Sequence, residues 1–240
     1  MPRNIEKECI STPISSQIKS RKRVAEHGEV FTNPREVNAM LDLVKDESYR
    51  IDSRFLEPAC GDGNFLIEIL HRKLVSVLEK YKKSHSDYEK YAFLAVTSMY
   101  GIELLSDNAV SCRNRLFKYW NDEYTKICKK DASDECREAV RYVFEKNILC
   151  GNALTLKKVD ENTKDTDEPV IFAEWSFVTG NLIKRRDFRL DEMIAGHGTD
   201  QGEFSLFMND WEYDKETKAF IPKPIKEYPL IDYRKVQENG

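Results

Sequence analysis

The sequence predicts an α/β fold in which a mostly parallel sheet is flanked by helices. Short apolar runs alternate with longer segments whose apolar residues recur at helical spacing, which is typical of parallel strands joined by helices. A tight turn at Gly61 and Gly63 links the first apolar run to a helical segment that continues to about residue 83. The predicted strands span 52–57, 98–103, 146–150 and 169–173.

The glycine turn is the most informative of these elements. A strand, a glycine turn and a helix bring backbone N–H groups close to a polar ligand. Gly61 and Gly63 lack Cβ atoms where the chain must turn sharply. Two glycines do not make the three-glycine dinucleotide fingerprint, and the carboxylate of Glu57 would repel a pyrophosphate. Glu57 instead suits a ligand that carries a cationic amine.

Residues 55–66 read FLEPACGDGNFL. They resemble motif I of S-adenosylmethionine-dependent methyltransferases, in the LEPACGxGxFL form of adenine-N6 DNA methyltransferases. The resemblance implies a Rossmann-like class I methyltransferase core with S-adenosylmethionine as its cofactor. It covers about 28–190, and three further segments occur in the order expected for the γ-type arrangement.

Upstream, residues 28–34 (GEVFTNP) resemble motif X, which is written G-x-x-[FY]-T-P. Asn33 separates Thr32 from Pro34, which departs from that pattern. The same residues predict the start of a helix, because Thr32 or Asn33 can cap it and Pro34 suits the first turn. A plain capped core helix is the alternative interpretation.

Downstream, residues 99–104 (MYGIEL) close a predicted strand with Glu103, which can accept hydrogen bonds from ribose hydroxyls. Residues 147–154 (NILCGNAL) resemble motif III, usually written G-D-A, whose Asp accepts a hydrogen bond from the adenine amino group. Asn152 replaces that Asp, and its amide oxygen can still accept. A surface strand end and an ordinary turn are the respective alternatives. Carried over residue by residue, the resemblance implies cofactor binding by Phe31, Thr32, Glu57, Ala59, Gly61, Gly63, Phe65, Glu103, Leu104, Asn152 and Ala153.

The catalytic element of the family departs most from its pattern. Motif IV is [NDS]-P-P-[FYW] at the end of a strand, and it holds the amine of a flipped base while its aromatic ring stacks on that base. Here the predicted strand 169–173 is followed by Glu174, Trp175, Ser176 and Phe177, and the chain contains no Pro-Pro. Glu174 could accept from an amine, and Trp175 or Phe177 could stack. A second segment, 180–183, also lacks the prolines, so a degenerate or repurposed loop is the favoured interpretation.

The charge balance argues against strong autonomous DNA binding. The 240 residues carry a formal net charge of −4, whereas DNA-binding domains are usually basic. Lys184, Arg185, Arg186 and Arg189 form a local cationic run close to the motif IV position. We expect this run to contact a nucleic-acid backbone, with a solvated surface as the alternative.

Cysteine and histidine spacing indicate neither disulfides nor a metal site. The six cysteines form no CxxC pair, and the four histidines show no metal-ligand spacing. No signal peptide and no apolar run of membrane-spanning length occurs. We therefore expect a cytoplasmic protein without a metal ion or a membrane contact.

The predicted organisation is a polar arm at 1–23, a cofactor-binding domain at 24–190 and an irregular C-terminal extension at 191–240 packed on the same domain. Nothing is long enough for a separate target-recognition region. The favoured function is a DNA methyltransferase-like protein of a restriction-modification or mobile-element system that binds cofactor without catalysing transfer alone, with a specificity or catalytic subunit as partner. The alternatives are an active adenine-N6 DNA methyltransferase and a methyltransferase that acts on RNA, protein or a small molecule.

Overall fold

The fold is built around a three-stranded parallel sheet. The computed structural model describes residues 20–27, 29–195, 211–214 and 219–240. The helices are α1 (Arg21–His27), α2 (Pro34–Asp42), α3 (Lys45–Tyr49), α4 (Asn64–Tyr81), α5 (His85–Thr97), α6 (Ser106–Cys128), α7 (Asp134–Asn147) and α8 (Leu190–Ala195), with 3-10 helices η1 (Lys129–Asp131) and η3 (Tyr233–Asn239). The strands are β1 (Phe55–Glu57), β2 (Met99–Glu103), β3 (Ile148–Cys150), β4 (Lys157–Val159), β5 (Asp165–Pro169), β6 (Ile171–Thr179), β7 (Leu182–Arg189), β8 (Trp211–Asp214), β9 (Ala219–Pro222), β10 (Lys226–Glu227) and β11 (Ile231–Asp232).

The parallel sheet has the order β1-β2-β3. Phe55 pairs with Met99, and Glu103 pairs with Cys150. These strands confirm the α/β class and the first three predicted strands, although β1 and β3 are shorter than predicted. Because parallel strands end at the same edge of a sheet, the segments that follow Glu57, Glu103 and Cys150 lie close together.

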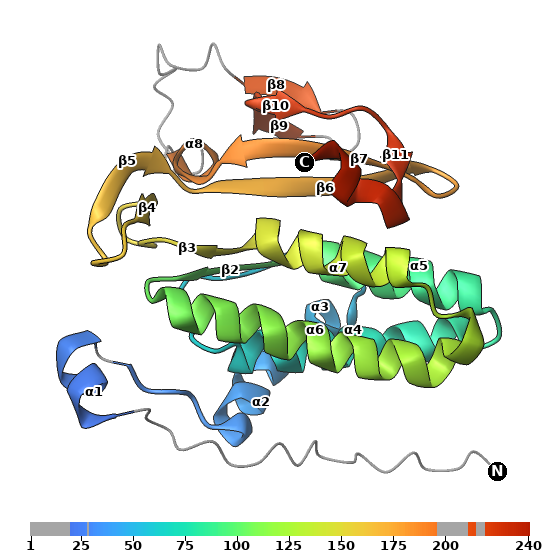
Figure 1. Ribbon diagram of the computed structural model, residues 1–240, viewed down its shortest axis with the longest axis horizontal. Coiled ribbons are helices and arrows are strands. Elements are labelled where there is room, and N and C mark those ends of the chain that lie inside the picture. Colours follow the sequence, from blue (N-terminus) through green and yellow to red (C-terminus); the bar gives the residue numbers. More distant parts are fainter. Residues whose placement is uncertain (1–19, 28, 196–210, 215–218) are drawn as a thin grey trace.

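The two faces of this sheet pack against different parts of the chain. Met99 belongs to the large core formed with the helices, whereas Tyr100 and Ile102 pack with Val170, Phe172 and Leu190. Figure 1 shows the β6–β7 hairpin on one side of β2 and β3, with α4 and α6 on the other. The apolar stripe predicted after the glycine turn forms the buried face of α4, with Leu66, Ile69, Leu70, Leu74 and Val77 in the core.

The prediction of a fourth parallel strand at 169–173 is wrong. Residues 171–179 form β6, which pairs antiparallel with β7 from Ile171↔Arg189 to Thr179↔Leu182. A two-residue turn at Gly180 and Asn181 joins them, and Gly180 has φ +53°. So short a connection permits only antiparallel pairing. In the described part of the chain, β6 does not pair with β1, so the sheet is not the full parallel sheet that was expected.

The described C-terminal segments add to this antiparallel layer. β10 and β11 pair with β7, and η3 packs against α7. The carboxylate of Glu89 on α5 accepts from the hydroxyls of Tyr124 and Tyr233 and from the Arg234 guanidinium, which anchors η3 to the helices. Most of the predicted arm (1–19) and residues 196–210 and 215–218 lie outside the described residues. No helix in the described ranges has the length and apolarity that crossing a membrane requires.

Candidate functional site

The glycine turn joins β1 to α4 at the carboxyl edge of the parallel sheet. Gly61 has φ +53° and Gly63 has φ +96°, both in the left-handed region that favours glycine. A Cβ at Gly63 would lie 2.7 Å from Sγ of Cys112, and a Cβ at Gly61 would lie 3.3 Å from the Phe31 ring. The backbone therefore requires both glycines, and Phe31 covers the turn.

Glu103 ties the end of β2 to this turn. Its Oε2 accepts a hydrogen bond from the Gly61 amide at 2.8 Å, and its Oε1 accepts from the Leu105 amide at 3.0 Å. The residue is 8% exposed. A carboxylate offers about four lone-pair sites, so Glu103 retains capacity for a further donor at the carboxyl ends of the strands.

Two other carboxylates at this edge have unused acceptor capacity. In the part of the chain that the structure describes, Glu57 has no ion pair and only a long hydrogen bond from the Ala59 amide, at 3.4 Å. Burial raises the pKa of Glu57. Asp62 pairs through Oδ2 with Arg115 at 2.7 Å, while its buried Oδ1 has no partner among the described residues. This arrangement fits a ligand with a cationic amine.

The motif X segment lies against the same turn. Asn33 caps α2 by accepting from the Arg35 amide at 2.9 Å, so the predicted capped helix is confirmed. The carbonyl of Thr32 accepts a hydrogen bond from the Asn64 side chain at 3.1 Å, at the start of α4. Phe31 and Thr32 are thus brought to the residues predicted to bind the cofactor, and the neighbouring Phe65 packs partly buried against the helical core.

Asn152 follows β3 at this edge. The Gly151 amide donates to the backbone carbonyl of Glu103 at 2.9 Å, which joins the two strand ends. The Asn152 oxygen accepts from the Leu154 amide at 3.0 Å, and its amide group donates to Asp165 at 2.9 Å. One lone pair of this oxygen is therefore engaged in its own turn, and Ala153 packs against the Ile102 cluster.

The three predicted catalytic residues do not come together. They lie within β6 and not in a loop, so the expectation of a loop at 174–177 is wrong. Successive residues of a strand point to opposite faces. Trp175 is buried against the helical core and donates through Nε1 to Asn147 at 3.1 Å, and Phe177 packs near Phe93 and Tyr233. Glu174 points to the other face.

Glu174 is held by two arginines. Its Oε1 lies 2.6 Å from Arg54 and its Oε2 lies 3.0 Å from Arg186. Arg54 precedes β1, whereas the glycine turn follows it. A strand rises about 3.3 Å per residue, so Glu174 lies near the opposite end of β1 from the predicted cofactor residues.

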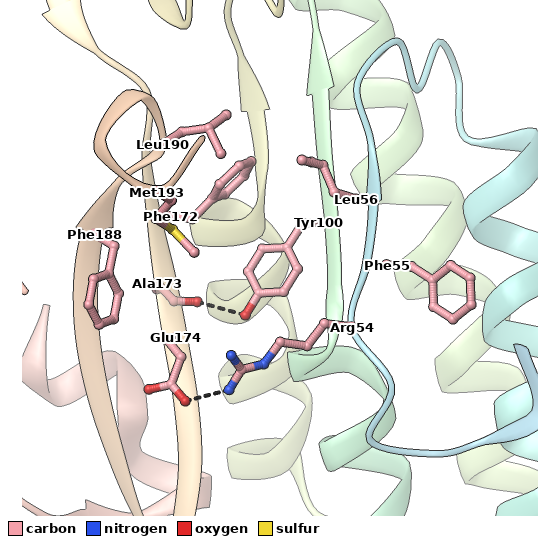
Figure 2. Close-up of a pocket in the computed structure, with 10 residues that line it drawn as sticks. All are labelled: Arg54, Phe55, Leu56, Tyr100, Phe172, Ala173, Glu174, Phe188, Leu190 and Met193. Carbon is pink, nitrogen blue, oxygen red and sulfur yellow. Dashed lines mark hydrogen bonds and ion pairs between the residues drawn. The ribbon is translucent and has the colours of Figure 1, made fainter. Parts of the chain in front are cut away.

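Glu174 borders a small cavity of about 170 Å³ between β6 and the parallel sheet. Figure 2 shows Tyr100 reaching from β2 toward β6, with its hydroxyl donating to the Ala173 carbonyl at 3.1 Å. The Arg54–Glu174 ion pair lies beside it. Most of the lining is apolar, from Leu56, Phe172, Phe188, Leu190 and Met193. Sequence reasoning missed Arg54 and Tyr100, since no local pattern links them to Glu174.

The cationic run on β7 is matched by carboxylates. Lys184 pairs with Glu227 at 2.6 Å, and Arg189 pairs with Asp191 at 2.6 Å. Arg185 is only 6% exposed and makes two bonds of 2.8 Å to Asp187, with the Tyr228 ring 4.1 Å away. Contrary to expectation, Arg185 is not part of an exposed cationic surface. Contact of nucleic acid with Lys184, Arg186 and Arg189 stays a prediction.

Comparison with known proteins gives one family. The family model described as MmeI, DNA-methyltransferase domain, matches residues 32–183, which is more than half of the chain and includes the glycine turn, Glu103 and Asn152. Neither the curated proteins nor the solved structures yield a match. The chain belongs to the MmeI DNA-methyltransferase domain family.

Proposed function

We propose that this protein binds S-adenosylmethionine at the carboxyl ends of β1, β2 and β3, and that it serves DNA methylation in a restriction-modification system without transferring methyl groups on its own. The observation that carries the proposal is that the predicted cofactor residues and the predicted catalytic residues lie apart in the structure. The predicted cofactor residues converge at one edge of the parallel sheet, whereas Glu174, Trp175 and Phe177 lie in β6 and point to different faces.

The chain's own residues would hold the cofactor as follows. Glu57 is the partner for the cationic amine, since its partly buried carboxylate has no ion-pair partner among the described residues. Glu103 is the acceptor for the ribose hydroxyls. Asn152 is the acceptor for the adenine amino group through the second lone pair of its oxygen. When bound, the cofactor supplies an activated methyl group to a nucleophilic amine.

The geometry of β6 supports a lack of autonomous transfer. A base amine must be aligned with the methyl group, and a misplacement of about 1 Å can cost about a hundredfold in rate. Glu174 is already engaged by Arg54 and Arg186. Trp175 is buried in the helical core. Neither side chain is available for an extruded base without rearrangement of the hairpin.

An active enzyme with a partner is the second candidate, and the edge of the parallel sheet favours it. β1 pairs only with β2 among the described strands. An unpaired strand edge can accept a strand from another chain. A specificity or catalytic subunit bound here would add to the parallel sheet beside the glycine turn and could supply the missing catalytic loop.

Two measurements test the proposal. Calorimetry with S-adenosylmethionine and S-adenosylhomocysteine measures binding by the purified chain. Tritiated-methyl transfer is then assayed on unmethylated DNA and on RNA, with and without cell extract. Absence of heat at millimolar cofactor would overturn the cofactor claim. Robust transfer to DNA by the isolated chain would favour the active enzyme, transfer only with extract would favour a partner, and transfer to RNA would favour a different substrate class.

A further inference from the structure

A buried amide links Glu103 to a second carboxylate. Asn108, in the first turn of α6, is 1% exposed. Its Nδ2 donates to Oε1 of Glu29 at 2.6 Å and makes a second, longer hydrogen bond of 3.4 Å to Oε1 of Glu103. An Asn side chain carries two N–H donors on this nitrogen. Asn108 therefore bridges two acceptors that would otherwise repel each other, and it fixes the side of Glu103 that faces away from Gly61.

Arg23 supplies the opposite charge at the outer end of this link. Its guanidinium donates to both oxygens of Glu29, at 2.5 and 2.9 Å, and to both oxygens of Asp107, at 2.8 and 3.1 Å. Such forked contacts restrict orientation as well as adding charge-assisted bonds. Arg23 belongs to α1, so this contact fastens α1 to the first turn of α6.

These contacts form a continuous path from α1 to the glycine turn. It runs from Arg23 through Glu29, Asn108 and Glu103 to the Gly61 amide. The side chain of Glu29 is 7% exposed and Glu103 is 8% exposed, so neither carboxylate is well solvated. Loss of a partner from a buried charge is costly. The orientation of Glu103 therefore depends on Asn108, and through Glu29 on Arg23, in addition to the Gly61 and Leu105 amides.

We infer that Asn108 and Arg23 are positioning residues for Glu103, and that they hold its carboxylate ready for the ribose hydroxyls of S-adenosylmethionine. The inference rests on the proposed function. It gives α1, which precedes the matched methyltransferase region, a role in cofactor selectivity. It also explains why an Arg with two carboxylate partners lies beside the end of β2.

The test compares variants by calorimetry with S-adenosylhomocysteine and with its 2′-deoxy analogue. Asn108→Ala and Arg23→Ala should each weaken binding of the ribose form by about tenfold, and should reduce the preference for ribose over deoxyribose. Arg23→Lys should recover part of the loss, because it restores the charge without the fork. Two controls should bind as wild type does: Asn114→Ala, an exposed residue of the same helix, and Lys22→Ala, an exposed neighbour on α1.

The outcomes separate the inference from the proposed function. If wild type binds and the Asn108 and Arg23 variants bind equally well, the inference fails and the proposed function stands. Equal weakening of both ligands, with ribose preference retained, would also overturn it, because that result indicates a general effect on the fold. If wild type binds neither ligand, both the inference and the proposed function are wrong. Thermal melts of each variant identify any that unfolds. If an Ala variant unfolds, the comparison of Arg23→Lys with wild type provides the test.

Discussion

Glu174 lies 2.6 Å from the guanidinium of Arg54, across the gap between β6 and the start of β1. This ion pair connects the antiparallel hairpin to the parallel sheet, and the Arg186 guanidinium adds a second contact at 3.0 Å. The residue that the sequence places at the catalytic position is thus a structural contact between two layers of the fold.

Glu174→Gln should therefore affect stability and leave cofactor binding unchanged. Loss of the charge weakens two charge-assisted hydrogen bonds, and we expect the free energy of unfolding to fall by about 1–3 kcal/mol. Urea unfolding measures this, with Glu161→Gln in the exposed β4–β5 turn as the control. Tritiated-methyl incorporation into unmethylated genomic DNA should stay near background for wild type and variant. Robust wild-type incorporation that Glu174→Gln abolishes would instead assign Glu174 to catalysis.

Glu103→Ala should weaken S-adenosylhomocysteine binding by roughly tenfold or more, because a lost charge-assisted hydrogen bond is worth about 1.5–3 kcal/mol. It also leaves the Gly61 and Leu105 amides without their acceptor. Calorimetry measures the affinity, and Glu161→Ala serves as the matched loss of an exposed carboxylate. Wild-type affinity in a folded Glu103→Ala protein would show that this carboxylate is not a cofactor ligand.

Local patterns predicted the parts of the fold that depend on local chemistry. The helical spacing of Leu66, Leu70 and Leu74 predicted the buried face of α4, and Gly61 and Gly63 predicted the turn. Glu57, Glu103 and Asn152 were identified through the resemblance to methyltransferase motifs. The parallel strands β1, β2 and β3 bring these residues to one edge of the sheet, because parallel strands end at the same edge.

The missed features depend on contacts between distant residues. Arg23 and Asp107 are 84 positions apart, and Arg54 and Glu174 are 120 apart. No spacing rule in one sequence links such pairs. The β6–β7 hairpin did have a local signal, since Gly180 and Asn181 separate two strand-like runs. The family pattern, which has motif IV at the end of a strand, instead implied a strand followed by a loop.

Gly63→Ala should destabilise the protein more than Gly180→Ala. Both glycines have positive φ, but a Cβ at Gly63 meets Cys112 Sγ at 2.7 Å, whereas a Cβ at Gly180 meets nothing within 4 Å. We expect the free energy of unfolding to fall by about 2–4 kcal/mol for Gly63→Ala and by about 1 kcal/mol for Gly180→Ala. Urea denaturation gives both values. Equal losses would mean that Cys112 moves aside and that only the backbone conformation matters.

Binding of duplex DNA by the purified chain should be weak and strongly dependent on salt. The net charge is −4, and each cation of the β7 run has a carboxylate partner. Arg189→Ala should reduce the slope of log binding constant against log salt concentration by about 1, which corresponds to the loss of one phosphate contact. Arg185→Ala should mainly lower stability, because Arg185 is buried. Fluorescence anisotropy from low to physiological salt tests this. A sequence-specific complex at physiological salt without a partner would contradict it.

Cofactor affinity should depend on pH through Glu57. Burial raises the pKa of this carboxyl above its ordinary value of 4.5, so the group stays neutral to a higher pH than in the unfolded chain. An ammonium ligand favours the ionised carboxylate, so affinity should rise as pH increases through the raised pKa and then level off. The contribution of Glu57 to folding stability changes with pH in the opposite direction. The folded state binds more protons in this window, so the contribution of Glu57 to stability falls as pH rises.

Calorimetry with S-adenosylhomocysteine between pH 4.5 and 7 measures the first effect, over a range in which the amine of the ligand stays charged. Glu57→Gln is the matched variant, because it keeps the shape of the side chain and removes its ionisation. It should bind more weakly at neutral pH and lose the dependence on pH in this range. If Glu57→Gln retains the wild-type pH profile, another group controls binding, and the assignment of the cationic amine to Glu57 is wrong.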